Sequence, residues 1–263
     1  MEPLQASSEG PGAFAKIGRW RLLDLEAKDP AMNMALEEAV ARAVGRRASE
    51  ATLRLWRNEN AVVIGRFQSA ELEVDLGACE RYGAEVIRRF TGGGAVYQDM
   101  GNLNFSVSIP SENLKADPFS ALPLLSSPVV LALRSLGLEA ELRGMKIKIG
   151  GAKVSGLAGC LRWGCCFLHG TLLIDSDLSR IRELLIGPSA ASNYVRSSPD
   201  EVANLSDLKP GIDMEAMRRS LVRSFGEAFG GGPASGRLTD FEIRLANSLY
   251  KEKYSTEDWN LVP

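Results

Sequence analysis

The stretch Arg88-Arg89-Phe90-Thr91-Gly92-Gly93-Gly94-Ala95-Val96-Tyr97-Gln98-Asp99 places three consecutive glycines between two strand-like segments. Glycine has no Cβ, so such a run lets the backbone take positive φ angles and approach a ligand closely. Successive N–H groups in the turn can bind an anion. Arg88 and Arg89 at its mouth add forked donors that suit phosphate or carboxylate. We predict an anion-binding loop, against the simpler alternative of a flexible hairpin tip with two solvated arginines.

The segments around this loop predict an α+β fold. Strands are expected at residues 18–25, 53–56, 61–64, 85–90, 95–97, 103–109, 146–149 and 167–174, and helices at 30–44, 76–83, 129–136, 178–185, 214–229 and 239–251. Residues 53–56 and 61–64 are interpreted as a hairpin across the short connection 57–60. Because the strands mostly follow one another instead of alternating with helices, a largely antiparallel sheet flanked by helices is favoured.

Length and charge limit the classes of protein that fit. The chain has 263 residues, with 31 basic and 33 acidic side chains and a net charge of −2. This balance argues against sequence-independent nucleic-acid binding, which needs a basic surplus. No apolar run reaches the roughly 18 residues of a membrane span. We expect a flexible arm at residues 1–17, followed by one domain at 18–263, in the cytoplasm.

The four cysteines do not form a metal motif. Cys160, Cys165 and Cys166 crowd into seven residues, Cys79 stands apart, and no pair of C-x₂₋₄-C knuckles is present. Reduced thiols and no protein-bound metal are therefore expected.

A second motif surrounds a lysine with small residues. Gly150-Gly151-Ala152-Lys153-Val154-Ser155-Gly156-Leu157-Ala158-Gly159 would let a ligand approach the ammonium of Lys153 from either face. A fixed cation can stabilise the negative charge that develops when an activated carboxyl group is attacked. The alternative is a lysine that protects an edge strand from aggregation. That alternative suits Lys146 and Lys148, but it does not suit Lys153, whose neighbours are not strand-forming.

Together the two motifs resemble a known superfamily. RRFTGGGAVYQDMGNLNFS (88–106) and GAKVSGLAG (151–159), with FLHGTLLID (167–175), are similar to the signatures of lipoate-protein ligase A and the lipoyl/octanoyl transferases. This biotin/lipoate A/B protein ligase superfamily is similar in fold to biotin ligases and class II aminoacyl-tRNA synthetases. The resemblance implies a catalytic role for Lys153 at the acyl carbonyl and the phosphate. It further implies that the nucleotide and acyl group are bound by Arg89, Gly92, Gly93, Gly94, Ala95, Val96, Tyr97, Lys153 and His169. For His169, lining the pocket is favoured over acting as a general base.

The resemblance leaves several activities open. A ligase would activate lipoate with ATP and Mg²⁺ to lipoyl-AMP and pass the lipoyl group to an acceptor lysine. An octanoyl or lipoyl transferase would take the acyl group from acyl carrier protein through a cysteine thioester. Neither 142–152 nor 187–193, where such a cysteine would stand, contains one, although Cys165 and Cys166 keep this alternative open. A biotin ligase would require an arginine–glycine repeat that is missing. A non-catalytic lipoyl-binding module is the remaining possibility.

The resemblance also implies partners. Expected acceptors are the acyltransferase subunit of a 2-oxoacid dehydrogenase and the glycine-cleavage H protein. Residues 253–260 resemble the close of the large domain in these ligases. We therefore expect the archaeal type that lacks the C-terminal accessory domain, and a separate small accessory subunit in its place.

Overall fold

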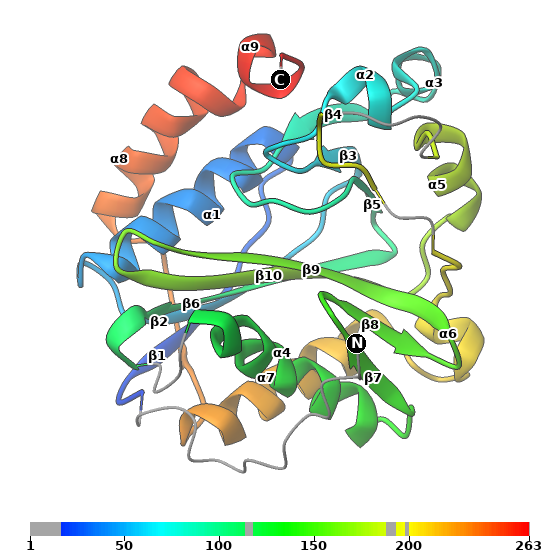
Figure 1. Cartoon of the computed structure of the whole chain (residues 1–263). Helices are drawn as coiled ribbons and strands as arrows, with labels where there is room; N and C mark the ends of the chain where they lie inside the picture. Colours follow the sequence, from blue (N-terminus) through cyan, green and yellow to red (C-terminus); the bar gives the residue numbers. More distant parts are fainter. Residues whose placement is uncertain (1–16, 114–117, 188–192, 198–199, 263) are drawn as a thin grey trace.

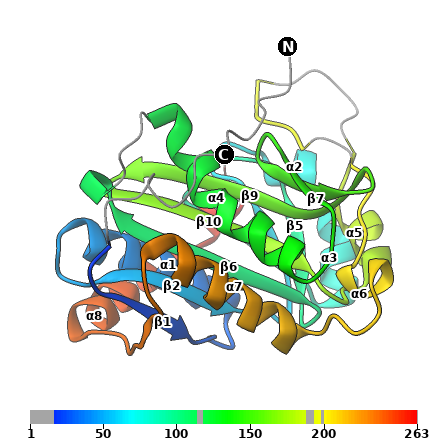
Figure 2. The ribbon, with the colours of Figure 1, turned by 90° about the horizontal axis from the view of Figure 1, so that it is seen from below.

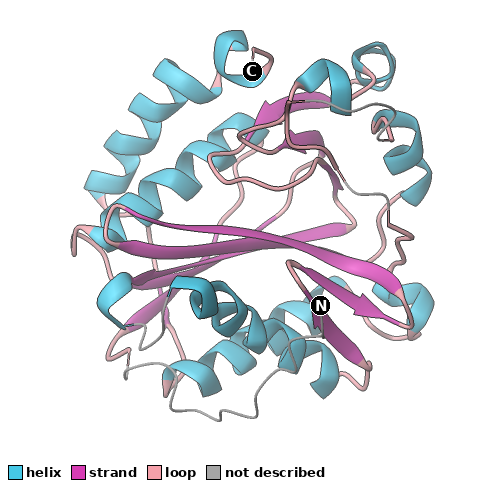
Figure 3. Ribbon diagram, in the orientation of Figure 1, coloured by secondary structure: helices cyan, strands magenta, loops and turns pink. Residues whose placement is uncertain are grey.

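The computed structural model describes residues 17–113, 118–187, 193–197 and 200–262, which form two sheets enclosed by helices (Figures 1 and 3). Residues 1–16 of the expected N-terminal arm lie outside the described residues. Ile17, which we assigned to that arm, is buried and joins the main hydrophobic core.

The large sheet has the strand order β11-β1-β2-β6-β10-β9-β8-β7. In that order the strands are Ala234–Ser235, Trp20–Asp24, Ala51–Trp56, Asn102–Pro110, Cys165–Leu173, Ala152–Arg162, Lys146–Ile149 and Ala140–Arg143. Only the β11–β1 and β1–β2 pairs are parallel; the other five pairs are antiparallel. The α+β class with a largely antiparallel sheet is therefore confirmed.

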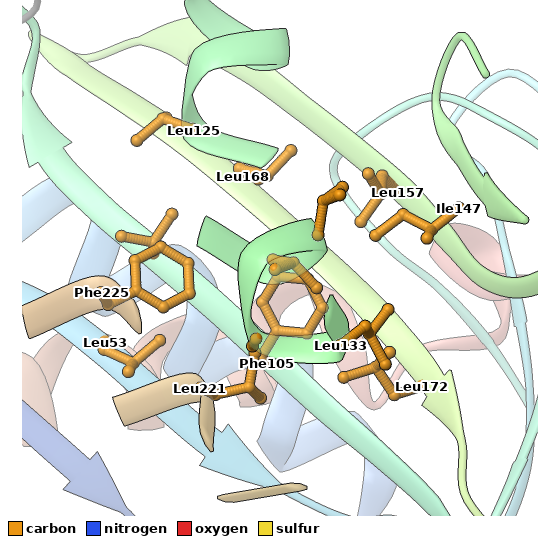
Figure 4. Close-up of a cluster of buried hydrophobic side chains, with 14 of the residues drawn as sticks. Leu53, Phe105, Leu125, Leu133, Ile147, Leu157, Leu168, Leu172, Leu221 and Phe225 are labelled. Atoms are coloured by element: carbon orange, nitrogen blue, oxygen red, sulfur yellow. The ribbon is translucent and has the colours of Figure 1, made fainter. Parts of the chain in front are cut away.

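Helices cover both faces of this sheet. Helices α4 (Pro118–Ser135) and α7 (Met214–Phe229) lie on one face (Figure 2), and α1 (Pro30–Gly45) lies on the other with α8 (Asp240–Leu249) packed against it (Figure 1). The core under α4 and α7 includes Phe105, Leu133 and Phe225 (Figure 4). In the described part of the chain, no helix is long and apolar enough to cross a membrane.

A smaller sheet lies beside the first, with the order β4-β3-β5. Its strands are Glu85–Arg88, Asn60–Ile64 and Val96–Asp99. The short helices are α2 (Ala70–Glu73), α3 (Leu76–Tyr82), α5 (Leu178–Leu184), α6 (Leu205–Leu208) and α9 (Glu257–Asn260), together with a π-helical turn at Tyr250–Tyr254 and a 3₁₀ turn at Ser111–Asn113. The glycine loop connects β4 to β5 and therefore belongs to the small sheet.

The predicted hairpin between residues 53–56 and 61–64 is wrong. These segments are β2 and β3, and they belong to different sheets. Asn58 in their connection is buried, with its amide donating to Gln98 Oε1 (2.6 Å) and its carbonyl accepting from Asn33 Nδ2 (2.8 Å). Because both partners are buried side chains, the connection turns inward and sends the chain to the second sheet.

Helix α4 begins earlier than the sequence predicts. We expected a helix only after Pro128, but α4 runs from Pro118 and contains both Pro123 and Pro128. A proline inside a helix leaves the carbonyl four residues earlier without its usual N–H partner. The hydroxyl of Ser127 donates to the carbonyl of Leu124 at 2.8 Å and so satisfies the group that Pro128 cannot bond.

Arg88 has a structural role, contrary to our interpretation of it as a phosphate-binding residue at the loop mouth. Its side chain is buried and donates to the carbonyls of Trp259 (2.7 Å), Gln68 (2.5 Å) and Asn260 (3.2 Å). Its backbone also binds this segment, because Arg88 N donates to Asn260 Oδ1 at 2.9 Å. Arg88 therefore fastens α9 to the small sheet.

We predict that Arg88→Met lowers the free energy of unfolding by about 3 kcal/mol, because several buried carbonyls lose a charged donor. Urea unfolding followed by circular dichroism measures the change. Arg219→Met is the matched control: Arg219 forms an exposed i,i+4 pair with Glu215 and should change stability by less than about 0.5 kcal/mol. Equal effects of the two substitutions would refute the role of Arg88.

Candidate active site

A cavity of about 230 Å³ lies at the glycine loop and is lined by elements of both sheets and by α1. Its wall combines apolar side chains with cations. Met34, Trp56, Val63 and Leu157 are among the apolar side chains, and Arg89, Lys146 and Lys153 are among the basic ones. A cavity of this composition suits a ligand with an apolar body and an anionic end.

The guanidinium of Arg89 holds the glycine loop from within. It donates to the carbonyls of Gly92 (2.6 Å), Gly94 (2.8 Å) and Val63 (3.0 Å). Burial lowers the pKa of Arg89 to about 10, and the nearby carboxylate of Glu37 opposes this shift. The arginine is thus a fixed positive charge at the cavity wall as well as a brace for the loop.

The loop requires glycine at two positions that face each other. A Cβ on Gly65, at the end of β3, would lie 2.0 Å from the carbonyl oxygen of Gly93, which no side chain could tolerate. Gly93 itself has a φ of 89°, in the region that favours glycine. This close approach of two backbone segments places Gly93, Gly94, Ala95 and Val96 on the cavity wall.

A chain of hydrogen bonds connects the loop to α1 through the single histidine. His169 Nε2 lies 2.7 Å from Thr91 Oγ1, and its Nδ1 lies 2.7 Å from Glu37 Oε2. His169 lines the cavity, as we favoured. Because both ring nitrogens are engaged, the imidazole links the start of the loop to a buried carboxylate.

Lys153 reaches the cavity from β9, although its small neighbours led us to place it outside a strand. Its backbone pairs on one side with Lys148 and on the other with the chain at Val202. Gly156 leaves room for its side chain, since a Cβ there would lie 3.3 Å from Lys153 Nζ. Burial lowers the pKa of Lys153, whereas Asp200 raises it. Lys153 and Arg89 thus contribute cations to one cavity.

The segment of residues 193–197 crosses the loop. Ser197 Oγ accepts a hydrogen bond from Ala95 N at 2.9 Å and another from Gln68 Nε2 at 3.1 Å. Glu73 holds this segment through Ser197 N (3.0 Å) and Arg196 Nε (2.5 Å). The hydroxyl of Ser197 therefore accepts a hydrogen bond from one of the loop N–H groups that we predicted to bind an anion.

Three buried polar side chains on the cavity wall have atoms without a hydrogen-bond partner among the described residues. These atoms are Glu37 Oε1, Asn104 Nδ2 and Trp56 Nε1. Leaving such groups unpaired is unfavourable, so they can contribute to ligand binding.

The structure brings together most of the residues that the motifs indicated. Arg89, Gly93, Gly94, Ala95, Val96, Lys153 and His169 line the cavity. Gly92 and Tyr97 do not; the Tyr97 hydroxyl donates to Asn60 Oδ1 at 3.2 Å. Glu37 escaped the sequence reasoning, although an acidic residue at a core-facing position of an apolar helix was a visible signal.

The cysteines described near the site are not activated thiols. Burial raises the pKa of Cys160 to about 11 and that of Cys166 to about 12, and it raises the pKa of Cys165 still further. None of the three lines the cavity. Within the described residues, no group of three potential metal ligands occurs.

Comparisons with known proteins agree on one family. Residues 29–226 match the model of the lipoyl protein ligase A/B catalytic domain. Lipoate-protein ligase A subunit 1 of Thermoplasma acidophilum is 35% identical over 92% of this chain and 96% of that protein. Lipoate–protein ligase 1 of Staphylococcus aureus is 33% identical over 88% of this chain and 70% of that protein.

Solved structures give the same result. The T. acidophilum lipoate protein ligase with bound lipoic acid superposes with a TM-score of 0.81 at 34% identity, covering 92% of this chain and 99% of that one. A lipoate-protein ligase A bound with ATP gives the same TM-score and identity, with 92% and 98% covered. Together with the cavity geometry, these matches show that the chain is an enzyme of the lipoyl protein ligase A/B family.

Proposed function

We propose that the chain activates lipoate with ATP to lipoyl-AMP and then forms an amide between the lipoyl group and a lysine of an acceptor protein. The observation that carries this proposal is the cavity, in which an apolar wall meets Arg89, Lys153 and the glycine loop. Relatives of known structure bind lipoic acid in one case and ATP in another.

In the first step, the lipoate carboxylate attacks the α-phosphorus of ATP and pyrophosphate leaves. Two anions must approach each other, which is unfavourable unless fixed cations reduce their repulsion. Lys153 and Arg89 supply these charges. Mg²⁺ would enter as part of the substrate MgATP and would reduce the charge of the phosphates further.

Binding of the adenylate requires room and free N–H groups. The cavity of about 230 Å³ is smaller than the roughly 300–1,000 Å³ typical of small-molecule sites. Moreover, the N–H of Ala95 already donates a hydrogen bond to Ser197. We infer that the segment at 195–197 moves when the nucleotide binds, and that the glycine loop then covers the mixed anhydride and excludes water.

In the second step, the amine of the acceptor lysine attacks the lipoyl carbonyl and AMP leaves. Negative charge develops on the carbonyl oxygen, and in this proposal Lys153 stabilises it. The acceptor is a lipoyl domain in this proposal, because a T. acidophilum relative was solved as a bi-partite ligase with its E2 lipoyl domain. The glycine-cleavage H protein remains a predicted acceptor.

Lys153→Ala should reduce both adenylation and amide formation at least about 100-fold, because each step loses its fixed cation. Lipoate-dependent ATP–pyrophosphate exchange and mass spectrometry of an apo-acceptor measure the two steps. Lys251→Ala, which removes an exposed lysine that does not line the cavity, should leave both unchanged. Near-normal amide formation by Lys153→Ala would show that its assigned role is wrong.

The combined substitution of Cys160, Cys165 and Cys166 by alanine separates ligase from transferase. We expect ligation to stay within about threefold of the parent, because a ligase needs no thioester. The raised pKa values of all three thiols support this expectation. Loss of acyl transfer, together with an acyl-thioester trapped on the parent chain, would favour the transferase.

We further propose that a separate small subunit supports adenylation. The supporting observation is that the T. acidophilum relative is subunit 1 of a bi-partite ligase. The chain alone should transfer lipoyl from preformed lipoyl-AMP but should catalyse ATP–pyrophosphate exchange strongly only when the small subunit is added. A full exchange rate from the chain alone would contradict this part of the proposal. Release of AMP without any lipoylated acceptor would contradict the proposed ligase activity.

A further inference from the structure

Three lysines share one face of the β8–β9 hairpin. Lys146 and Lys148 alternate along β8 with the buried Ile147 and Ile149, and Lys148 lies directly opposite Lys153 on β9. Like charges that face each other across a strand pair repel. Lys146 and Lys153 both line the cavity. A concentration of positive charge at this place therefore needs an anion to compensate it.

Asp200 supplies that anion. Its Oδ2 lies 2.6 Å from Lys146 Nζ, and its Oδ1 lies 3.1 Å from Lys148 Nζ, while its side chain is only 8% exposed. Burial alone would raise the pKa of Asp200, but the two ammonium groups outweigh burial and lower it. The aspartate is therefore a buried carboxylate held between two cations.

Backbone pairing fixes Asp200 beside the reaction centre. The carbonyl of Glu201 accepts from Lys153 N at 2.7 Å, and Ala203 N donates to the carbonyl of Lys153 at 3.2 Å. Asp200 therefore immediately precedes residues that are hydrogen-bonded to β9 at Lys153. Of the two lysines that Asp200 engages, Lys146 lines the cavity, and Lys148 lies two residues further along the same face of β8.

We propose that Lys146 and Lys148 bind the β- and γ-phosphates of ATP, and that Asp200 occupies this phosphate site until the nucleotide displaces it. This inference rests on the proposed function and specifies where the leaving group lies. Lysine binds phosphate as a point charge, so two flexible lysines can exchange one carboxylate for a diphosphate. A diphosphate brings more negative charge than the aspartate and is the stronger partner.

Formation of the adenylate requires no added proton. A carboxylate oxygen of lipoate forms a bond to the α-phosphorus, the bond from that phosphorus to the bridging oxygen of the β-phosphate breaks, and pyrophosphate leaves with the electron pair. Lys146 and Lys148 stabilise the charge that develops on this leaving group. In the second step no β- or γ-phosphate is present, so these two lysines have no role in amide formation.

Binding of inorganic pyrophosphate to the purified full chain, measured by calorimetry at fixed ionic strength, tests the site directly. Lys146→Met/Lys148→Met should weaken binding by about tenfold or more. Asp200→Asn should strengthen it several-fold, because the competing carboxylate is gone. Glu201→Gln makes the same change in net charge at the adjacent, exposed carboxylate and should alter binding much less. Equal affinity in all four proteins would overturn the proposal.

A kinetic test distinguishes the loss of the phosphate site from a general loss of structure. With the small subunit supplied if needed, Lys148→Met should raise the KM for ATP and lower exchange, yet transfer from preformed lipoyl-AMP should stay at the parent rate. Lys148→Arg should recover part of the exchange. Parallel loss of both steps would mean that Lys148 is only structural and would refute its role. If the unsubstituted chain shows neither step, the proposed function itself fails, whereas intact exchange in Lys148→Met refutes only the phosphate site.

Discussion

The buried guanidinium of Arg89 is the constraint on which the site depends. A charged group in the interior must have its donors satisfied, and Arg89 meets this requirement by binding the carbonyls of Gly92, Gly94 and Val63. The loop therefore curls around the arginine and directs the carbonyls of Gly92 and Gly94 toward it. Glu37 compensates the charge from α1. Through His169 and Thr91 the same carboxylate also holds the beginning of the loop.

The neighbouring Arg88 shows how one dipeptide serves two purposes. Successive side chains in a strand point to opposite faces, so Arg88 and Arg89 at the end of β4 diverge. One arginine binds the carbonyls of α9 and its surroundings, and the other binds the glycine loop. The position of the loop is consequently coupled to the docking of residues 259–260. Because both contacts depend on β4, a shift of that strand would disturb the cavity and the C-terminal turn together.

The sequence predicted the composition of the site better than its construction. Runs of glycine and small residues around a lysine indicate backbone freedom at one place in the sequence. The loop and Lys153 could therefore be selected as candidate cavity residues without a structure. Periodicity does not report which strands pair, and the hairpin assigned to residues 53–64 failed because buried amides at Asn33 and Gln98 redirect the chain through Asn58. Arg88 was misassigned for a similar reason. Its partners include backbone carbonyls 171 and 172 residues away in the sequence, and carbonyls carry no sequence signal.

In the proposed function one lysine serves two reactions, and the division of charge across the cavity accounts for this. Arg89 and the loop lie on the small-sheet side of the cavity, and Lys146 and Lys153 line it from β8 and β9 of the large sheet, so an anion between them would meet positive charge on both sides. An apolar wall disfavours a carboxylate, so the proposed substrate would place its acyl tail against that wall and its carboxyl end at this boundary. In the proposed reaction, adenylation and amide formation both involve an oxygen bound to that carboxyl carbon. Because this carbon would stay where the apolar tail is anchored, Lys153 would face it in both steps while the phosphate groups beside it change.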